Sequence, residues 1–96
     1  MFLARVEGAV VATKKDPSMN GRKLLILRQT DETGEPSGKP YVAVDTVDAG
    51  IGDLVLTAAG SSARQTDITK DTPVDAVIMS IIDSLKVDGE VVFRKS

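Results

Sequence analysis

The first predicted strand is marked by alternating apolar and polar positions between Phe2 and Thr13. Every second position holds an apolar residue or a glycine, namely Phe2, Ala4, Val6, Gly8, Val10 and Ala12. A period of two is typical of a strand with one buried face, so Phe2 is expected to point toward the core. Glycine inside a strand often marks a bend or a bulge, and Gly8 is the expected place for one.

Two further strands are expected at Lys23 to Thr30 (KLLILRQT) and Tyr41 to Val47 (YVAVDTV). The first of these is apolar on both parities in its middle, which is typical of a strand covered on both faces. Residues 31–40 lie between the two strands and hold two glycines, two prolines and three acidic residues. This composition predicts a long exposed hairpin connection.

A glycine-rich corner and a fourth strand occupy the middle of the chain, which reads VDAGIGDLVLTAAGSSAR from Val47 to Arg64. The apolar run Leu54 to Ala59 predicts the strand. Carboxylates in a turn commonly accept backbone N–H hydrogen bonds, and we favour this structural role over paired acid/base chemistry. The residues expected to form the corner are Asp45, Asp48, Gly50 and Gly52.

A short helix is expected near residue 72. Thr72 suits the N-cap, Pro73 suits the first helical position, and Asp75 completes a capping box. Apolar residues then recur at spacings of three and four, as on one face of a helix; they are Val74, Val77, Ile78 and Ile81. The pattern changes to alternation from about Met79, so we expect about two helical turns followed by a strand.

The last predicted feature is a two-residue hairpin at Asp88-Gly89, because both residue types suit the positive φ angles of a type I′ turn. Its second strand is expected to place Phe93 toward the core and to close a barrel against the first strand. Together these elements predict a mainly β fold, a small five-stranded OB-like β-barrel with one short α-helix. We expect residues 1–96 to form a single domain.

Composition narrows the possible functions. The 96 residues contain no cysteine and no histidine, and their net charge is -2. The commonest general base, the usual transition-metal ligands and thiolate chemistry are therefore missing, so we expect neither an enzyme nor a metal or cofactor site. There is also no apolar run of the length that a membrane span or a secretory signal needs. We therefore expect a cytoplasmic protein without a membrane partner.

At the corner, the sequence resembles a known family. The segment DAGIGDLVL, the following GSSAR and the downstream TPVDAVIMSIID are similar, in this order and spacing, to the EutN/CcmL family of pentameric bacterial microcompartment shell vertex proteins. The opening strand with Gly8 extends the similarity over almost the whole chain. The resemblance implies an OB-related barrel, a homopentamer, a place at the vertices of a polyhedral shell tiled by hexameric shell proteins, and no catalysis.

The GSSAR segment is then the candidate subunit contact, at the interface or near the five-fold axis. Small side chains allow backbones to approach closely, and the guanidinium of Arg64 has five donors that can bind a carboxylate or carbonyl groups. The proposed contact residues are Gly60, Ser61, Ser62, Ala63 and Arg64. Catalysis by either serine is disfavoured because the chain has no histidine base.

The alternative hypothesis is an OB-type module that binds single-stranded nucleic acid. Such a module needs a basic groove and aromatic side chains on which bases stack. The chain has a net negative charge and only three aromatic residues, Phe2, Tyr41 and Phe93. We therefore favour the shell protein and expect no nucleic-acid partner.

Overall fold

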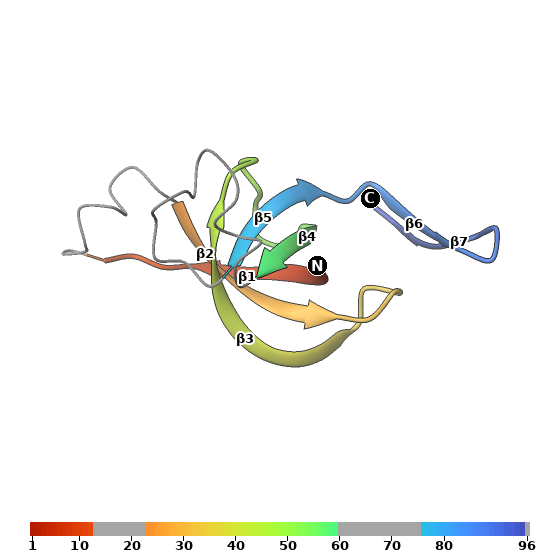
Figure 1. Cartoon of the computed structure of the whole chain (residues 1–96), viewed down its shortest axis with the longest axis horizontal. Coiled ribbons are helices and arrows are strands. Elements are labelled where there is room, and N and C mark those ends of the chain that lie inside the picture. Colours follow the sequence, from red (N-terminus) through yellow and green to blue (C-terminus); the bar gives the residue numbers. More distant parts are fainter. Residues whose placement is uncertain (13–22, 60–75, 96) are drawn as a thin grey trace.

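The computed structural model describes residues 1–12, 23–59 and 76–95, which form seven strands (Figure 1). Five strands close into a barrel in the order β1-β2-β3-β5-β4, and the other two form a separate hairpin. The barrel strands are β1 (Phe2–Ala9), β2 (Lys23–Thr30), β3 (Pro36–Asp45), β4 (Leu54–Ala59) and β5 (Ala76–Ile81). The hairpin strands are β6 (Ser84–Val87) and β7 (Glu90–Arg94). The mainly β class and the five-stranded barrel are thereby confirmed.

The barrel is held mostly by antiparallel pairing. Strand β1 pairs with both β2 and β4, and the only parallel contact among the described strands joins β3 to β5 through Val44↔Val77 and Asp45↔Ile78. The register of β1 and β2 shifts between Val6 and Gly8, which confirms the irregularity expected at this glycine. A closed barrel satisfies the backbone groups that an open sheet would leave unpaired at its edges.

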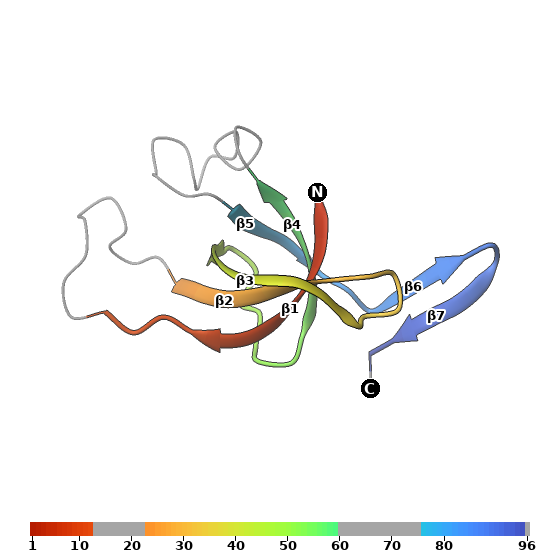
Figure 2. The same ribbon diagram turned by 90° about the horizontal axis from the view of Figure 1, so that it is seen from below.

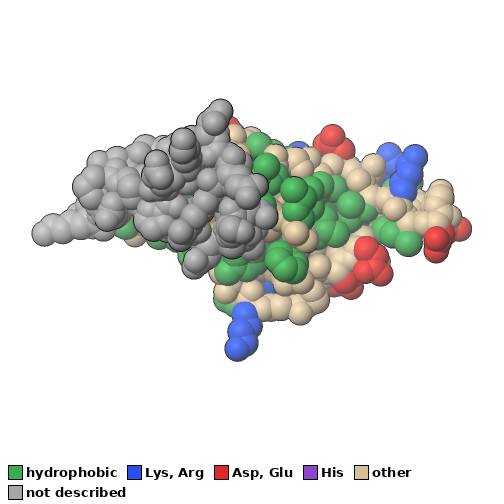
Figure 3. Space-filling view, in the orientation of Figure 1, with side chains coloured by type: hydrophobic (Ala, Val, Ile, Leu, Met, Phe, Trp, Pro, Cys, Tyr) green, Lys and Arg blue, Asp and Glu red, His purple; other side chains and the backbone are tan. Residues whose placement is uncertain are grey.

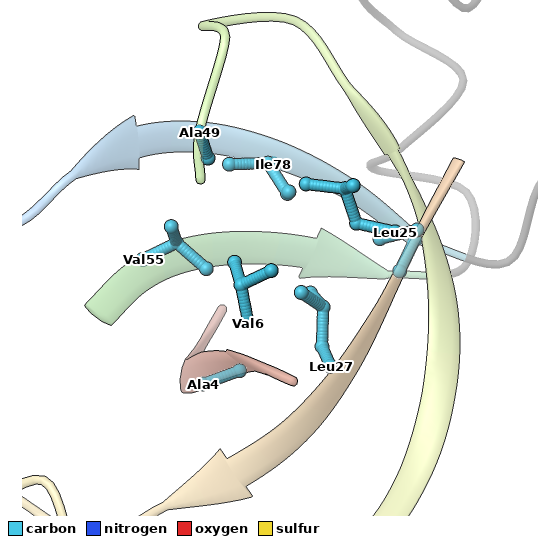
Figure 4. Packing of buried hydrophobic residues seen from close by; sticks show 9 residues of the cluster. Ala4, Val6, Leu25, Leu27, Ala49, Val55 and Ile78 are labelled. Atoms are coloured by element: carbon cyan, nitrogen blue, oxygen red, sulfur yellow. The ribbon is translucent and has the colours of Figure 1, made fainter. Parts of the chain in front are cut away.

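The core lies inside the barrel and is built from alternate residues of its strands. Figure 4 shows the side chains of Val6, Leu27 and Val55 pointing toward one another from three different strands. Nine buried residues make up this cluster: Ala4, Val6, Leu25, Leu27, Ala43, Ala49, Val55, Ala76 and Ile78. A second buried cluster, Val44, Ala58 and Val77, includes the neighbours of core residues along their strands. Because neighbouring side chains on a strand point to opposite faces, this second cluster lies on the outer face.

The expected short helix is wrong. Residues 76–81 form strand β5, and the described part of the chain contains no helix. The described residues therefore include no helix that could cross a membrane. The error has a physical cause, since β5 is buried on both faces. Ile78 points into the core and Val77 belongs to the outer cluster. Because both faces of β5 are apolar, its sequence does not alternate between apolar and polar residues. Thr72, Pro73 and Asp75 lie outside the described residues.

Three smaller expectations also need correction. The last strand does not close the barrel, because β7 pairs with β6 alone and β1 closes against β4. The connection after Thr30 is shorter than expected, since β3 already begins at Pro36. Asp31 caps this tight turn by accepting hydrogen bonds from the backbone N–H groups of Thr33 and Glu35, at 2.8 and 3.1 Å. Phe2 is not in the core, as 45% of it is exposed.

The hairpin predicted at Asp88-Gly89 is confirmed. Asp88 and Gly89 have φ angles of 52° and 81°, as a type I′ turn requires, and they join β6 to β7. Figure 2 shows that this hairpin extends away from the barrel instead of lying against its wall. The described chain is thus a barrel with a projecting two-stranded arm.

Candidate functional site

The corner between β3 and β4 is organised by the carboxylate of Asp45. Its two oxygens accept hydrogen bonds from the backbone N–H groups of Val47 and Ala49, at 3.0 and 2.9 Å. Only 1% of the Asp45 side chain is exposed, so these bonds lie away from solvent. Asp48 follows with a φ of 58°, a conformation that aspartate tolerates better than most residues. The corner-forming role that we assigned to Asp45 and Asp48 stays a prediction, and these contacts are the geometry on which it rests.

The second half of the corner is built by Asp53 around Gly50 and Gly52. One Asp53 carboxylate oxygen accepts the N–H of Gly50 at 2.8 Å, and the Asp53 N–H donates to the carbonyl of Gly50 at 3.1 Å. Gly52 has a φ of 94°, which glycine adopts without strain. Backbone bonds from Gly52 to Val6 and from Val6 to Asp53 fasten the corner to β1.

Lys23 adds a cation to this corner. Its ammonium donates to the Asp48 carboxylate at 3.2 Å and to the Ala49 carbonyl at 3.0 Å, and it lies 3.5 Å from Asp45. The hydrogen bond with Asp48 raises the pKa of Lys23 above 10.5; the charges of Asp48 and Asp45 act in the same direction, and partial desolvation opposes them. The lysine therefore stays charged at neutral pH and neutralises part of the acidic cluster.

Arg5 joins the corner, the β2–β3 turn and the hairpin arm. Its guanidinium donates to the carbonyl of Gly52 at 2.9 Å and to that of Gly34 at 3.0 Å. The same group lies over the Phe93 ring, 5.7 Å from its centroid, at a cation–π distance. Sequence reasoning missed this role because the hydrogen-bond partners are 47 and 29 positions away. No local pattern around Arg5 signals it.

A cavity of about 320 Å³ lies at this junction, lined by Arg5, the corner and the end of β7. Although Arg5, Arg94 and Lys95 make it basic, two of these cations already have partners in the chain. Arg5 binds two carbonyls, and the Lys95 ammonium lies 3.8 Å from the Asp53 carboxylate. The cavity is therefore better explained as the joint between arm and barrel than as a ligand site.

The described part of the chain shows no arrangement of side chains typical of a catalytic or metal-binding site. Among residues 1–12, 23–59 and 76–95, no group of three or more acidic side chains could hold a metal ion. The corner carboxylates of Asp45 and Asp53 are occupied by backbone N–H groups. The expected subunit contact, Gly60 to Arg64, lies outside the described residues and stays a prediction.

Comparison with known proteins identifies a family. The sequence model of the family described as "Ethanolamine utilisation protein EutN/carboxysome" matches residues 1–83. This match spans the five barrel strands and ends one residue before β6.

Two relatives match over most of the chain. The carboxysome shell vertex protein CcmL of Gloeobacter violaceus is 44% identical over 95 residues, which cover 99% of this chain and 95% of that protein. The bacterial microcompartment shell vertex protein PduN of Salmonella typhimurium is 46% identical over 89 residues, which cover 88% of this chain and 98% of PduN.

A similar solved structure is that of GrpN, a pentameric microcompartment shell protein from Rhodospirillum rubrum. It superposes with a TM-score of 0.81 at 40% identity, and the match covers 91% of this chain and 99% of that one. The barrel described above is therefore also found in a shell protein that assembles as a pentamer.

Proposed function

The chain belongs to the EutN/CcmL family, and we propose that five copies of it form a ring that occupies a vertex of a bacterial microcompartment shell. The observation that carries this function is the match, over nearly the full length, to proteins named as shell vertex proteins. The similar solved structure of GrpN is that of a pentameric shell protein. The protein is a structural component of the shell, in the cytoplasm, and not an enzyme.

The mechanism is geometric. A ring of identical subunits that associate head to tail closes when the rotation between neighbours is one fifth of a turn, and each subunit then uses two different surfaces. Flat layers of hexamers cannot close into a polyhedron without five-fold corners. We propose that the pentamer fills these corners and that hexameric shell proteins surround it.

Gly60 to Arg64 is our proposed contact near the subunit boundary. What supports it is the residue types: glycine, serine and alanine leave space for a neighbouring backbone, and one arginine supplies directed donors. In the sequence, the segment directly follows β4, a strand of the closed barrel.

Binding of single-stranded nucleic acid is the alternative, and we propose that the chain has no nucleic-acid or membrane partner. Two of the three aromatic residues are poor stacking platforms. The Tyr41 hydroxyl lies 3.0 Å from that of Thr57, a fully buried residue, and the Phe93 ring is covered by Arg5. Phe2 is the exposed exception. Binding to single-stranded DNA that weakens as salt rises would contradict this proposal.

The mass of the assembly in solution tests the function. Native mass spectrometry and light scattering should both give five times the mass of one chain at micromolar concentration. A stable monomer, or a ring of another size, would contradict the proposal. Adding the pentamer to assembling hexameric shell proteins should convert open sheets or tubes into closed shells, as seen by electron microscopy.

A further inference from the structure

The exposed large hydrophobic side chains on the described strands fall into two separate groups. On the barrel they are Phe2, Val42 and Met79, and on the arm they are Val87 and Val91. Figure 3 shows hydrophobic side chains over the barrel and again toward the end of the arm. A head-to-tail ring needs two different surfaces on each subunit that are complementary to each other. The barrel and the arm each carry exposed apolar side chains, so each can supply one of these two surfaces.

The arm is poorly supported within its own chain. Strands β6 and β7 pair with each other and with no other described strand. Among the described residues, the arm meets the barrel at its base, where the Phe93 ring lies beside Arg5 and the Lys95 ammonium lies near Asp53. A two-stranded hairpin is marginally stable in water unless a further surface packs against it. An arm that projects without such support is therefore expected to rest on another molecule.

One face of the arm forms an apolar ridge. Leu85 and Val87 lie on the same face because they are two residues apart on β6, and Phe93 shares it because it pairs directly with Leu85. The ridge begins at Phe93, against Arg5 of the same chain, and runs outward to Val87 beside the turn. Val87 is 41% exposed, so the outer end of the ridge lacks a partner within the described chain.

The complementary surface lies on the outer face of β2 and β3. Ile26 and Val42 are paired across these strands, and 45% of Val42 is exposed. Next along β3 on the same face, Val44 belongs to the outer buried cluster. Exposed apolar surface that continues a buried cluster is a favourable place for a partner to bury further area.

We propose that the β6–β7 hairpin is the arm with which each subunit grips the next copy in the ring, and that Val87 packs against the outer face of β3 at Val42. The inference rests on the proposed pentamer. It adds a contact that involves neither the Gly60–Arg64 segment nor the barrel interior. The partner that packs against the arm is a second copy of this chain. If a hexameric shell protein binds the arm instead, the proposal is overturned.

Cross-linking tests this contact directly, because the chain has no cysteine of its own. A variant carrying both Val87→Cys and Val42→Cys, treated with a short bis-maleimide, should give covalent multimers up to the pentamer on a denaturing gel. Each single variant should stay monomeric on the gel, because a head-to-tail contact does not bring identical positions together. The pair Ile51→Cys with Val42→Cys is the matched control, since Ile51 is exposed but belongs to neither surface. It should not cross-link.

A charged substitution gives an independent readout. Val87→Asp places a carboxylate in the proposed contact, and the ring should dissociate at a concentration about tenfold higher or more than the wild-type ring. Ile51→Asp should leave this concentration unchanged, and circular dichroism should show both variants folded.

The two proposals fail in different ways. A monomeric wild-type chain contradicts the proposed function. A wild-type pentamer that neither cross-links between positions 87 and 42 nor responds to Val87→Asp overturns the arm. A Val87→Asp pentamer that keeps its stability but fails to join hexamers would also overturn it, because the arm would then face the hexamer.

Discussion

Gly34 shows how a single residue can control the joint between arm and barrel. It has a φ of 88°, and a Cβ added there would lie 2.7 Å from Nη2 of Arg5 and 3.2 Å from Cδ1 of Phe93. Substitution with alanine therefore strains the backbone and also displaces the guanidinium that holds the arm. We expect Gly34→Ala to lower the free energy of unfolding by about 2 kcal/mol or more in denaturant titrations.

Gly89 provides the matched comparison for Gly34. Its φ of 81° is similar, but an added Cβ would meet nothing within 4 Å. Gly89→Ala should therefore cost about 1 kcal/mol, for backbone strain alone. Equal losses for the two variants would show that Arg5 and Phe93 adjust freely and that the joint is not tightly packed.

Asp45 is the residue on which the corner depends most. Replacing it with alanine leaves the N–H groups of Val47 and Ala49 without their acceptor in a buried place. We expect Asp45→Ala to cost about 2 to 3 kcal/mol of unfolding free energy. Asp48→Asn is the control, because 95% of the Asp48 side chain is exposed, and it should cost well under about 1 kcal/mol. Similar losses from both variants would contradict a structural role specific to Asp45.

Among the secondary-structure elements, β5 marks the limit of what the sequence could predict. Alternation identified β1, the turn residues Asp88 and Gly89 identified the hairpin, and apolar runs identified β2 and β4. Each of these signals comes from residues that are adjacent in the sequence, so it can be recognised without knowing the fold. Strand β5 is covered on both faces, so its burial depends on strands distant in sequence, and its apolar spacing resembled a helix. The spacing of apolar residues within one segment does not show which distant strands will cover it.

Ala76 distinguishes the strand from the expected helix experimentally. It lies off the predicted helical stripe, where a larger side chain would be tolerated, but in β5 it is only 2% exposed and part of the core cluster. Ala76→Leu should therefore overpack the barrel and lower the unfolding free energy by about 1 to 3 kcal/mol. Met79→Leu, at a partly exposed position of the same strand, should be nearly neutral. A neutral Ala76→Leu would argue against the barrel packing of this strand.

For the whole molecule, the sequence predicted a barrel but not how it closes. Pairing of β1 with β4 and of β3 with β5 depends on contacts between distant segments, which periodicity does not report. The role of Arg5 was missed for the same reason. The corner residues could be proposed because aspartates and glycines close together in the sequence are typical of a turn. The family was identifiable because three segments occur in a fixed order and spacing, whereas no single segment would have established it.

Arg64 belongs to the scale of the assembly, since its proposed partners lie on a neighbouring subunit. Arg64→Ala should leave the barrel folded, with an unchanged unfolding profile for the dissociated chain, and should weaken the ring. Loss of a charge-assisted contact across an interface is expected to raise the concentration of half-dissociation by about tenfold or more in native mass spectrometry on dilution.

Arg64→Lys separates charge from geometry in the same measurement. Lysine keeps the positive charge but lacks the planar guanidinium with its five donors. A ring of intermediate stability would show that the hydrogen-bond geometry of Arg64 matters, and a ring as stable as the wild type would show that charge alone is enough. Lys39→Ala is the control, because Lys39 is exposed on β3 at a position of opposite parity to Val42 and belongs to neither proposed contact, so the ring should stay intact. If Arg64→Ala assembles as the wild type does, Gly60 to Arg64 is not the subunit contact, and the arm would then have to carry the ring with other surfaces of the barrel.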